Sequence, residues 1–242
     1  MTLKKPFLYR LESFLWDVVD LVFPPTCPGC QTVGSPWCED CKQSVIRMNG
    51  RVCQVCGENC QQDICTRCKQ TRPLFIQARS WAVFKQPIRG ALHSLKYRQN
   101  IGLGQALAES ISPGLDELNW PVQAIIPIPI SQQRQRERGY NQVALVARPL
   151  AQLNSLEYLP AGLRRARHTR SQVGLNVEER KHNLKDAFLA DPQRVAGKQI
   201  LLMDDVCTTG TTLAEAARAL IDSGAKSVYA FTIARAISHK DA

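Results

Sequence analysis

Two adjacent carboxylates, Asp204 and Asp205, stand where an apolar run ends and a loop of small hydroxyl residues begins. The loop, CTTGTT at 207–212, is followed by an Ala-rich helical pattern. Its glycine permits a tight turn, and its backbone amides, threonine hydroxyls and the positive end of the next helix favour a monophosphate. A carboxylate pair accepts hydrogen bonds from two neighbouring hydroxyls, such as the 2′ and 3′ hydroxyls of a ribose. The stretch therefore predicts a site for a ribose 5-phosphate.

The loop differs from a P-loop because no Gly-Lys-Ser/Thr follows it. The alternative interpretation is an acidic helix cap followed by an ordinary threonine-rich loop. The candidate substrate-binding residues are Asp204, Asp205, Val206, Cys207, Thr208, Thr209, Gly210, Thr211 and Thr212.

Four C-x-x-C pairs lie between residues 27 and 68. Two residues between thiolates let both sulfurs turn toward one ion, and two pairs complete a tetrahedron. We therefore expect two structural Zn²⁺ ions, because all-cysteine sites leave no open position for catalysis. The candidate ligands are Cys27, Cys30, Cys38, Cys41, Cys53, Cys56, Cys65 and Cys68.

The spacing does not decide which two cysteine pairs bind the same zinc ion. Sequential ribbons join the first pair with the second, whereas a cross-brace joins the first with the third. Cys60 is surplus and is either a substitute ligand or a free thiol. A disulfide framework would need an oxidising compartment, so the cysteines indicate the cytoplasm.

Arginines are concentrated in two further stretches. Arg134, Arg136 and Arg138 alternate within 127–142, so in an extended loop they would share one side as a candidate pyrophosphate grip. A solvated basic loop or a contact with nucleic acid backbone is the alternative. The polar, arginine-rich stretch 163–188 predicts a flap that closes over the site, with an ordinary surface loop as its alternative.

Several alternating elements must position these residues. Apolar strands are expected at 78–84, 122–130, 198–204 and 226–235, and helices at 87–97, 103–111, 141–153 and 212–224. Strands that alternate with helices and read as continuous apolar runs indicate an α/β fold with a parallel sheet covered on both faces. Ligands of such sheets bind beyond the carboxyl ends of the strands, where Asp204 and Asp205 are expected.

The composition of the chain limits the classes of partner and of membrane segment that can be expected. The chain has 242 residues, 44% of them hydrophobic, and a formal charge of +10, so phosphate-bearing partners are plausible. No segment reaches the roughly 18 apolar residues of a membrane span. Residues 1–26 are predicted to form an amphipathic helix that packs on the protein, with a membrane-surface or partner contact as the alternative.

The stretch 200–212, ILLMDDVCTTGTT, resembles the motif by which type I phosphoribosyltransferases bind phosphoribosyl pyrophosphate (PRPP). Together with LKY (95–97), RQRERGYNQ (134–142) and the cysteine pairs, the whole-chain pattern is similar to the competence protein F (ComF) family. The resemblance implies a double zinc-ribbon module at 27–72 and a phosphoribosyltransferase-like domain at 73–242. It implies that Asp204 and Asp205 contact the ribose hydroxyls and that 207–212 surrounds the 5′-phosphate.

The family also implies PRPP with Mg²⁺ and a role in DNA uptake beside a helicase-like partner. The loop match carries over Arg136, Arg138, Gly139, Tyr140, Asn141 and Gln142. Cys60 and the lack of most histidine ligands near the cysteine pairs depart from the family pattern.

Two functions are therefore compared. One is phosphoribosyl transfer to an unidentified acceptor, with Asp204, Asp205, Arg136 and Arg138 as the catalytic residues. The other is a non-catalytic protein that senses PRPP or holds single-stranded DNA through its basic surface and zinc ribbons. A zinc-ribbon adaptor with a relic enzyme domain is a third, weaker hypothesis.

Overall fold

A computed structural model describes residues 24–98, 100–166 and 187–237. The amphipathic helix predicted within 1–26 lies almost wholly outside these residues and stays a prediction. No helix in the described ranges is long and apolar enough to cross a membrane.

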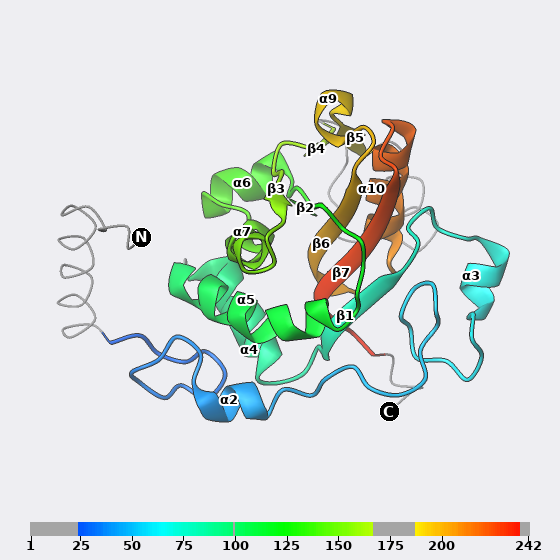
Figure 1. Cartoon of the computed structure of the whole chain (residues 1–242). Coiled ribbons are helices and arrows are strands. Elements are labelled where there is room, and N and C mark those ends of the chain that lie inside the picture. Colours follow the sequence, from blue (N-terminus) through cyan, green and yellow to red (C-terminus); the bar gives the residue numbers. More distant parts are fainter. Residues whose placement is uncertain (1–23, 99, 167–186, 238–242) are drawn as a thin grey trace, which may run out of the picture.

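Five parallel strands form the central sheet in the order β1-β7-β6-β2-β3 (Figure 1). Their bounds are Ala78–Val83 (β1), Ala124–Pro127 (β2), Glu157–Tyr158 (β3), Gln199–Cys207 (β6) and Ser227–Arg235 (β7). The predicted α/β fold is confirmed. The strand expected at 122–130 is shorter than predicted, and its last residue, Pro127, has no N–H to donate to a ladder.

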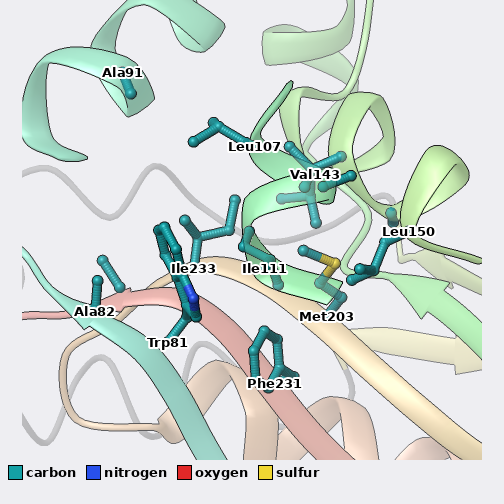
Figure 2. Packing of buried hydrophobic residues seen from close by; sticks show 14 of the residues in the cluster. Trp81, Ala82, Ala91, Leu107, Ile111, Val143, Leu150, Met203, Phe231 and Ile233 are labelled. Carbon is teal, nitrogen blue, oxygen red and sulfur yellow. The ribbon is translucent and has the colours of Figure 1, made fainter. Parts of the chain in front are cut away.

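Helices cover both faces of the sheet. Helices α4 (Ile88–Tyr97), α5 (Ile101–Asp116) and α7 (Gln142–Leu153) contribute to one core cluster, shown in part in Figure 2. Helix α10 (Thr211–Asp222) contributes to a second cluster on the opposite face. Because side chains alternate along a strand, the central strands supply apolar residues to both clusters.

Strand β6 sends its two acids to different faces. Leu201 and Met203 belong to the first core cluster, and Ile200 and Leu202 belong to the second. Asp205 therefore continues the row toward α4 and α7, and Asp204 continues the row on the α10 side. Pairing with β7 extends to Cys207, so both acids lie inside the strand, which was predicted to end at 204.

The two halves of the cysteine-rich region pack against different faces. Cys27 and Cys41 belong to the first core cluster, and Cys41 lies within the short helix α2 (Glu39–Gln43). The four cysteines around helix α3 (Thr66–Gln70) belong to the second cluster. Each half is therefore joined to the sheet domain by its own set of buried contacts.

The segment 132–138 is helix α6 (Gln132–Arg138), so its prediction as an extended loop is wrong. The Ser131 hydroxyl accepts a hydrogen bond from the backbone N–H of Arg134 and begins the helix, and Gly139, with φ of 79°, ends it. The Gln, Arg and Glu residues between them are good helix formers, which explains why this alternation does not produce extended backbone.

The predicted flap is described at its two ends. Strands β4 (Leu163–Arg165) and β5 (Phe188–Ala190) pair antiparallel in a separate small sheet, and helix α9 (Pro192–Val195) follows. Residues 167–186 lie outside the described ranges, so the flap itself stays a prediction.

Gly104 sets the close approach of α5 to α7. A Cβ at this position would lie 2.5 Å from the backbone oxygen of Leu145. We expect Gly104→Ala to lower the free energy of unfolding by about 2 kcal/mol, because backbone on the neighbouring helix must move. In the same helix, a Cβ on Gly102 would meet Asn100 only at 3.9 Å. Gly102→Ala is the control and should be neutral or slightly stabilising. Urea unfolding measures both variants, and equal losses would contradict the argument.

Candidate functional site

Asp205 is held in a network of buried and half-buried donors. Its side chain accepts from Lys96 Nζ at 2.7 Å and from Gln142 Nε2 at 2.9 Å, both at Oδ2, while Oδ1 accepts from the backbone N–H of Val206 at 2.7 Å. Asp205 is 8% exposed, so these bonds hold its carboxylate in one orientation. Arg138 extends the network by donating to Gln142 at 2.9 Å.

Asp204 has a different environment. Its Oδ1 accepts from the backbone N–H of Asp205 at 2.8 Å. Burial, together with the negative charge of Asp205, raises the pKa of Asp204 to about 8, although the positive charges of Lys96 and Arg134 act in the opposite direction. Asp204 therefore keeps its proton more readily than an ordinary aspartate at neutral pH, and a bound cation or diol would meet it beside the firmly held side chain of Asp205.

The predicted phosphate loop follows β6 directly. Gly210, with φ of 78°, is the N-cap of α10 and supplies no side-chain acceptor to the first turn. The hydroxyls of Thr209 and Thr211 lie 2.8 Å apart at the same end of the helix. Amide donors, hydroxyls and the positive end of a helix dipole thus meet at one place, which is the arrangement that binds a phosphate.

The predicted arginine grip is divided by helix α6. Residues four apart share a helix face, so Arg134 and Arg138 lie on one side and Arg136 lies on another. The charge of Arg134 acts on Asp204, and Arg138 stacks over the Tyr97 ring with 5.2 Å between guanidinium carbon and ring centroid. Arg136 is exposed. The structure therefore brings Arg134 and Arg138 toward the acids, and a catalytic role for Arg136 stays a prediction.

Two residues near the acids were assigned no site role from the sequence. Lys96 lies in the quoted LKY stretch, more than 100 residues before its partner Asp205. Arg165, on β4, is close enough for its charge to interact with those of Asp204 and Arg134, and burial lowers its pKa. The concentration of arginines at 163–188 was the available signal for Arg165, and the family pattern was the signal for Lys96.

The cysteines form two separate clusters of four. One contains Cys27, Cys30, Cys38 and Cys41, and the other contains Cys53, Cys56, Cys65 and Cys68, with sulfurs within 4.8 Å of one another in each. This is the sequential arrangement, and it matches the tetrahedral four-thiolate donor set of structural Zn²⁺. The two sites are thus structural zinc-ribbon sites. Cys60 lies outside both clusters, and its thiol contacts the carbonyl oxygen of Gln62 at 2.8 Å.

Arginines surround the second cluster. Arg67 Nη2 lies 3.7 Å from the sulfur of Cys56, Arg79 donates to the carbonyl oxygen of Gln54 at 3.2 Å, and Arg235 donates to that of Cys56. A zinc ion with four thiolates carries a net charge of about −2, so these guanidinium groups stabilise the loaded cluster. Arg235 also joins the second ribbon to the carboxyl end of β7, beside Cys207.

The raised pKa of Asp204 predicts a pH dependence of stability. The unfolded chain releases this proton near pH 4 and the folded protein near pH 8, so the free energy of unfolding falls as pH rises through that window. Asp204→Asn removes this effect. At pH 9 we expect the free energy of unfolding of the variant to be at least about 1 kcal/mol higher than that of the parent protein, which is the equivalent of roughly one pKa unit. The difference should be smaller at pH 6. Urea unfolding of zinc-loaded protein from pH 6 to 9 measures this, and parallel pH profiles would disprove it.

Two models of known protein families match this chain, one in its cysteine-rich part and one in its sheet domain. Residues 18–70 match the model of the double zinc ribbon domain, and residues 136–242 match that of the phosphoribosyl transferase domain. The DNA utilization protein YhgH of Salmonella typhi is 30% identical over 228 residues, covering 90% of this chain and 100% of that protein. Competence protein F of Haemophilus influenzae is 27% identical over 209 residues, covering 82% of this chain and 90% of that protein.

The chain belongs to the competence protein F (ComF) family. In this ComF-family protein the double-ribbon match contains both cysteine clusters, and the phosphoribosyl transferase match contains β6, the 207–212 loop and α10. Among solved structures, the glutamine PRPP amidotransferase of Bacillus subtilis is 15% identical, with a TM-score of 0.42 over 59% of this chain and 30% of that one.

Proposed function

We propose that this protein binds PRPP with Mg²⁺ at the carboxyl end of β6 and transfers its phosphoribosyl group during DNA uptake. The observation that carries the proposal is the continuous arrangement of Asp204, Asp205 and the loop at the start of α10, with Lys96 bonded to Asp205 at 2.7 Å. We also propose that the chain divides into segments 1–26, 27–72 and 73–242, and that it works in the cytoplasm, where zinc thiolates persist.

Each part of PRPP has a proposed partner in this site. Asp204 and Asp205 accept hydrogen bonds from the 2′ and 3′ hydroxyls, and residues 207–212 surround the 5′-phosphate. Arg138 is proposed for the pyrophosphate, with Arg136 as the second cation predicted from the sequence. Arg134 and Lys96, whose positive charges act to lower the pKa of Asp204, are proposed as further cations for the pyrophosphate.

The chemistry follows from the charges. The bond between the anomeric carbon and the pyrophosphate oxygen breaks, and its electron pair leaves with the pyrophosphate. The carbon gains oxocarbenium character beside Asp204 and Asp205, and a lone pair of the acceptor forms the new bond. Carboxylate and phosphate oxygens are the hard ligands that Mg²⁺ prefers, and the ion would neutralise the departing pyrophosphate. No described residue is assigned as a base for the acceptor.

Calorimetric titration tests the proposal. PRPP is titrated into zinc-loaded protein with and without Mg²⁺, beside ribose 5-phosphate as a shorter ligand. We expect saturable binding of both, with PRPP bound more tightly when Mg²⁺ is present. Pyrophosphate release is then followed in the presence of candidate acceptors. Failure of folded, zinc-loaded protein to bind either ligand would overturn the proposal.

A second candidate, binding of single-stranded DNA, is favoured by one surface. A cavity of about 490 Å³ between α4 and the first ribbon is lined by the cationic side chains of Arg89, Lys96 and Arg98. Tyr97 is 64% exposed there, with its ring 4.8 Å from that of His93. Stacking rings beside cations suit unpaired bases and their phosphates.

Oligothymidylate binding, followed by fluorescence anisotropy, tests this candidate. Tyr97→Ala should weaken binding by about 10-fold, since stacking contributes about 1–3 kcal/mol per base. Affinity that falls steeply with salt would support phosphate contacts. If Tyr97→Ala and the parent protein bind oligothymidylate with equal affinity, this surface does not bind single-stranded DNA. A helicase-like partner remains a further proposal for the same role in DNA uptake.

A further inference from the structure

Lys96 places a positive charge directly on one of the two adjacent acids. Its Nζ lies 2.7 Å from Asp205 Oδ2, and the two side chains are 25% and 11% exposed. The charge of Lys96 also reaches Asp204, where it opposes the effects that raise the pKa of that acid. One ammonium group therefore offsets part of the negative charge of the acid pair.

The backbone on both sides of Lys96 is held by the end of α6 and the residues that follow it. The Tyr140 hydroxyl donates to the carbonyl oxygen of Leu95, a fully buried residue, at 2.6 Å. The Arg138 guanidinium stacks over the Tyr97 ring, with its carbon 5.2 Å from the ring centroid. These contacts hold the last turn of α4 in place, so the Lys96 side chain is directed toward the acid pair.

Gln142, at the start of α7, holds Asp205 from a second direction. Its Oε1 accepts from Arg138 at 2.9 Å, which sets the orientation of the amide, and its Nε2 donates to Asp205 Oδ2 at 2.9 Å. Two donors from different helices thus meet at one oxygen, and one of them is a cation. A divalent cation that bound this oxygen would have to displace the ammonium group or lie beside it against charge repulsion.

We infer that Lys96 is a built-in counter-ion that takes the place of a divalent cation on Asp205, so that the ribose phosphate part of PRPP binds without metal. The identity of this ligand rests on the proposed function. The ribose hydroxyls meet a carboxylate whose charge is already compensated and whose orientation is set. Mg²⁺ is needed for the pyrophosphate part, because one ammonium group does not neutralise its several negative charges.

The ion pair can be reached from solution. Lys96 lines the cavity of about 490 Å³ beside the first ribbon, and the Asp205 side chain keeps part of its exposure. Replacing the lysine by a neutral side chain should therefore leave a carboxylate oxygen open to an ion from the solvent. Carboxylate oxygens are ligands that Mg²⁺ and Mn²⁺ both prefer, so Mn²⁺ is a suitable probe.

Lys96→Met tests the counter-ion directly, since methionine is an unbranched side chain without charge. Mn²⁺ is titrated into zinc-loaded protein in the absence of any ribose phosphate, and free Mn²⁺ is measured by electron paramagnetic resonance. We expect Lys96→Met to bind Mn²⁺ at least about 10-fold more tightly than the parent protein, because the charge repulsion at Asp205 has been removed. Equal Mn²⁺ affinity of folded Lys96→Met and the parent protein would overturn the inference.

Lys198→Met is the matched control. Lys198 also forms an ion pair with a carboxylate, that of Glu157, and its side chain is 33% exposed, close to the value for Lys96. Glu157 is the first residue of β3 and Lys198 directly precedes β6, so this pair lies at the edge of the sheet opposite Asp205. Lys198→Met should bind Mn²⁺ with an affinity within about twofold of the parent value, a difference of less than 1 kcal/mol.

Ribose 5-phosphate affinity provides a second measurement, which the parent protein alone can decide if Lys96→Met does not fold. Zinc-loaded protein is titrated by calorimetry in metal-depleted buffer and again with Mg²⁺. We expect Mg²⁺ to change the affinity of the parent protein by less than about threefold, and a larger gain would overturn the inference. Without Mg²⁺, Lys96→Met should bind at least about 10-fold more weakly than the parent protein, and Mg²⁺ should restore most of this loss.

The two measurements separate this inference from the proposed function, because the Mn²⁺ titration contains no ribose phosphate. If ribose 5-phosphate fails to bind while Lys96→Met gains Mn²⁺ affinity, the proposed function is wrong and the counter-ion on Asp205 stands. If ribose 5-phosphate binds to the parent protein while Lys96→Met gains no Mn²⁺ affinity, the proposed function stands and Lys96 is not a substitute for a divalent cation.

Discussion

Asp205→Asn is expected to weaken PRPP binding in the presence of Mg²⁺ by about 100-fold or more. Asp205 accepts from Lys96 and Gln142 at one oxygen and from the backbone N–H of Val206 at the other. An asparagine keeps the shape but must turn its NH₂ group toward one of these donors. Losing charge-assisted hydrogen bonds to the ribose hydroxyls costs about 3 kcal/mol, which corresponds to the stated loss of affinity.

Asp222→Asn is the control for this measurement. Asp222 is the last residue of α10, its side chain is 61% exposed, and its interaction with Arg218 spans 3.9 Å. Calorimetry of both variants should show unchanged affinity for Asp222→Asn. If folded Asp205→Asn binds PRPP as tightly as the parent protein, the acid pair does not hold the ribose.

Cys56→Ser is expected to have the second large effect, on both stability and phosphate binding. Structural zinc in small ribbons contributes apparent free energies of about 10–16 kcal/mol, comparable with the stability of a whole domain. Cys56 also accepts a hydrogen bond from Arg235 through its carbonyl, and Arg235 pairs in register with Cys207, the first residue of the phosphate loop. Loss of the second zinc should therefore lower ribose 5-phosphate affinity by at least 10-fold.

Cys30→Ser removes the same chemical group from the first cluster. Cys30 is exposed, and its cluster lies against the other face of the sheet, away from the 207–212 loop. We expect this variant to lose zinc but to keep ribose 5-phosphate affinity within about threefold, a difference of less than 1 kcal/mol. Metal analysis and calorimetry measure both variants. Equal loss of ribose 5-phosphate affinity in the two would show that the ribbons act only through global stability.

Strands β1, β2, β6 and β7 and helices α4, α5, α7 and α10 could be predicted from the sequence because their apolar patterns were long and punctuated. The short elements β3, β4, β5 and α9 were not predicted, because two to four residues carry too little periodicity. Helix α6 could not be predicted, since alternating arginines do not distinguish an exposed extended loop from a short helix. Its form depends on the Ser131 cap and on Gly139 in the left-handed region. That difference moved Arg136 away from the face shared by Arg134 and Arg138.

The sequence by itself determined the chemistry available: eight paired thiols for two zinc ions, two adjacent acids and a loop suited to phosphate. Only the tertiary structure decided which groups meet. It grouped the cysteine pairs sequentially, directed Asp204 and Asp205 to opposite faces of one strand, and brought Lys96 to Asp205. Local spacing specifies which ligands are within reach of one another along the chain, whereas contacts between distant segments depend on how α4 and the zinc ribbons pack on the sheet.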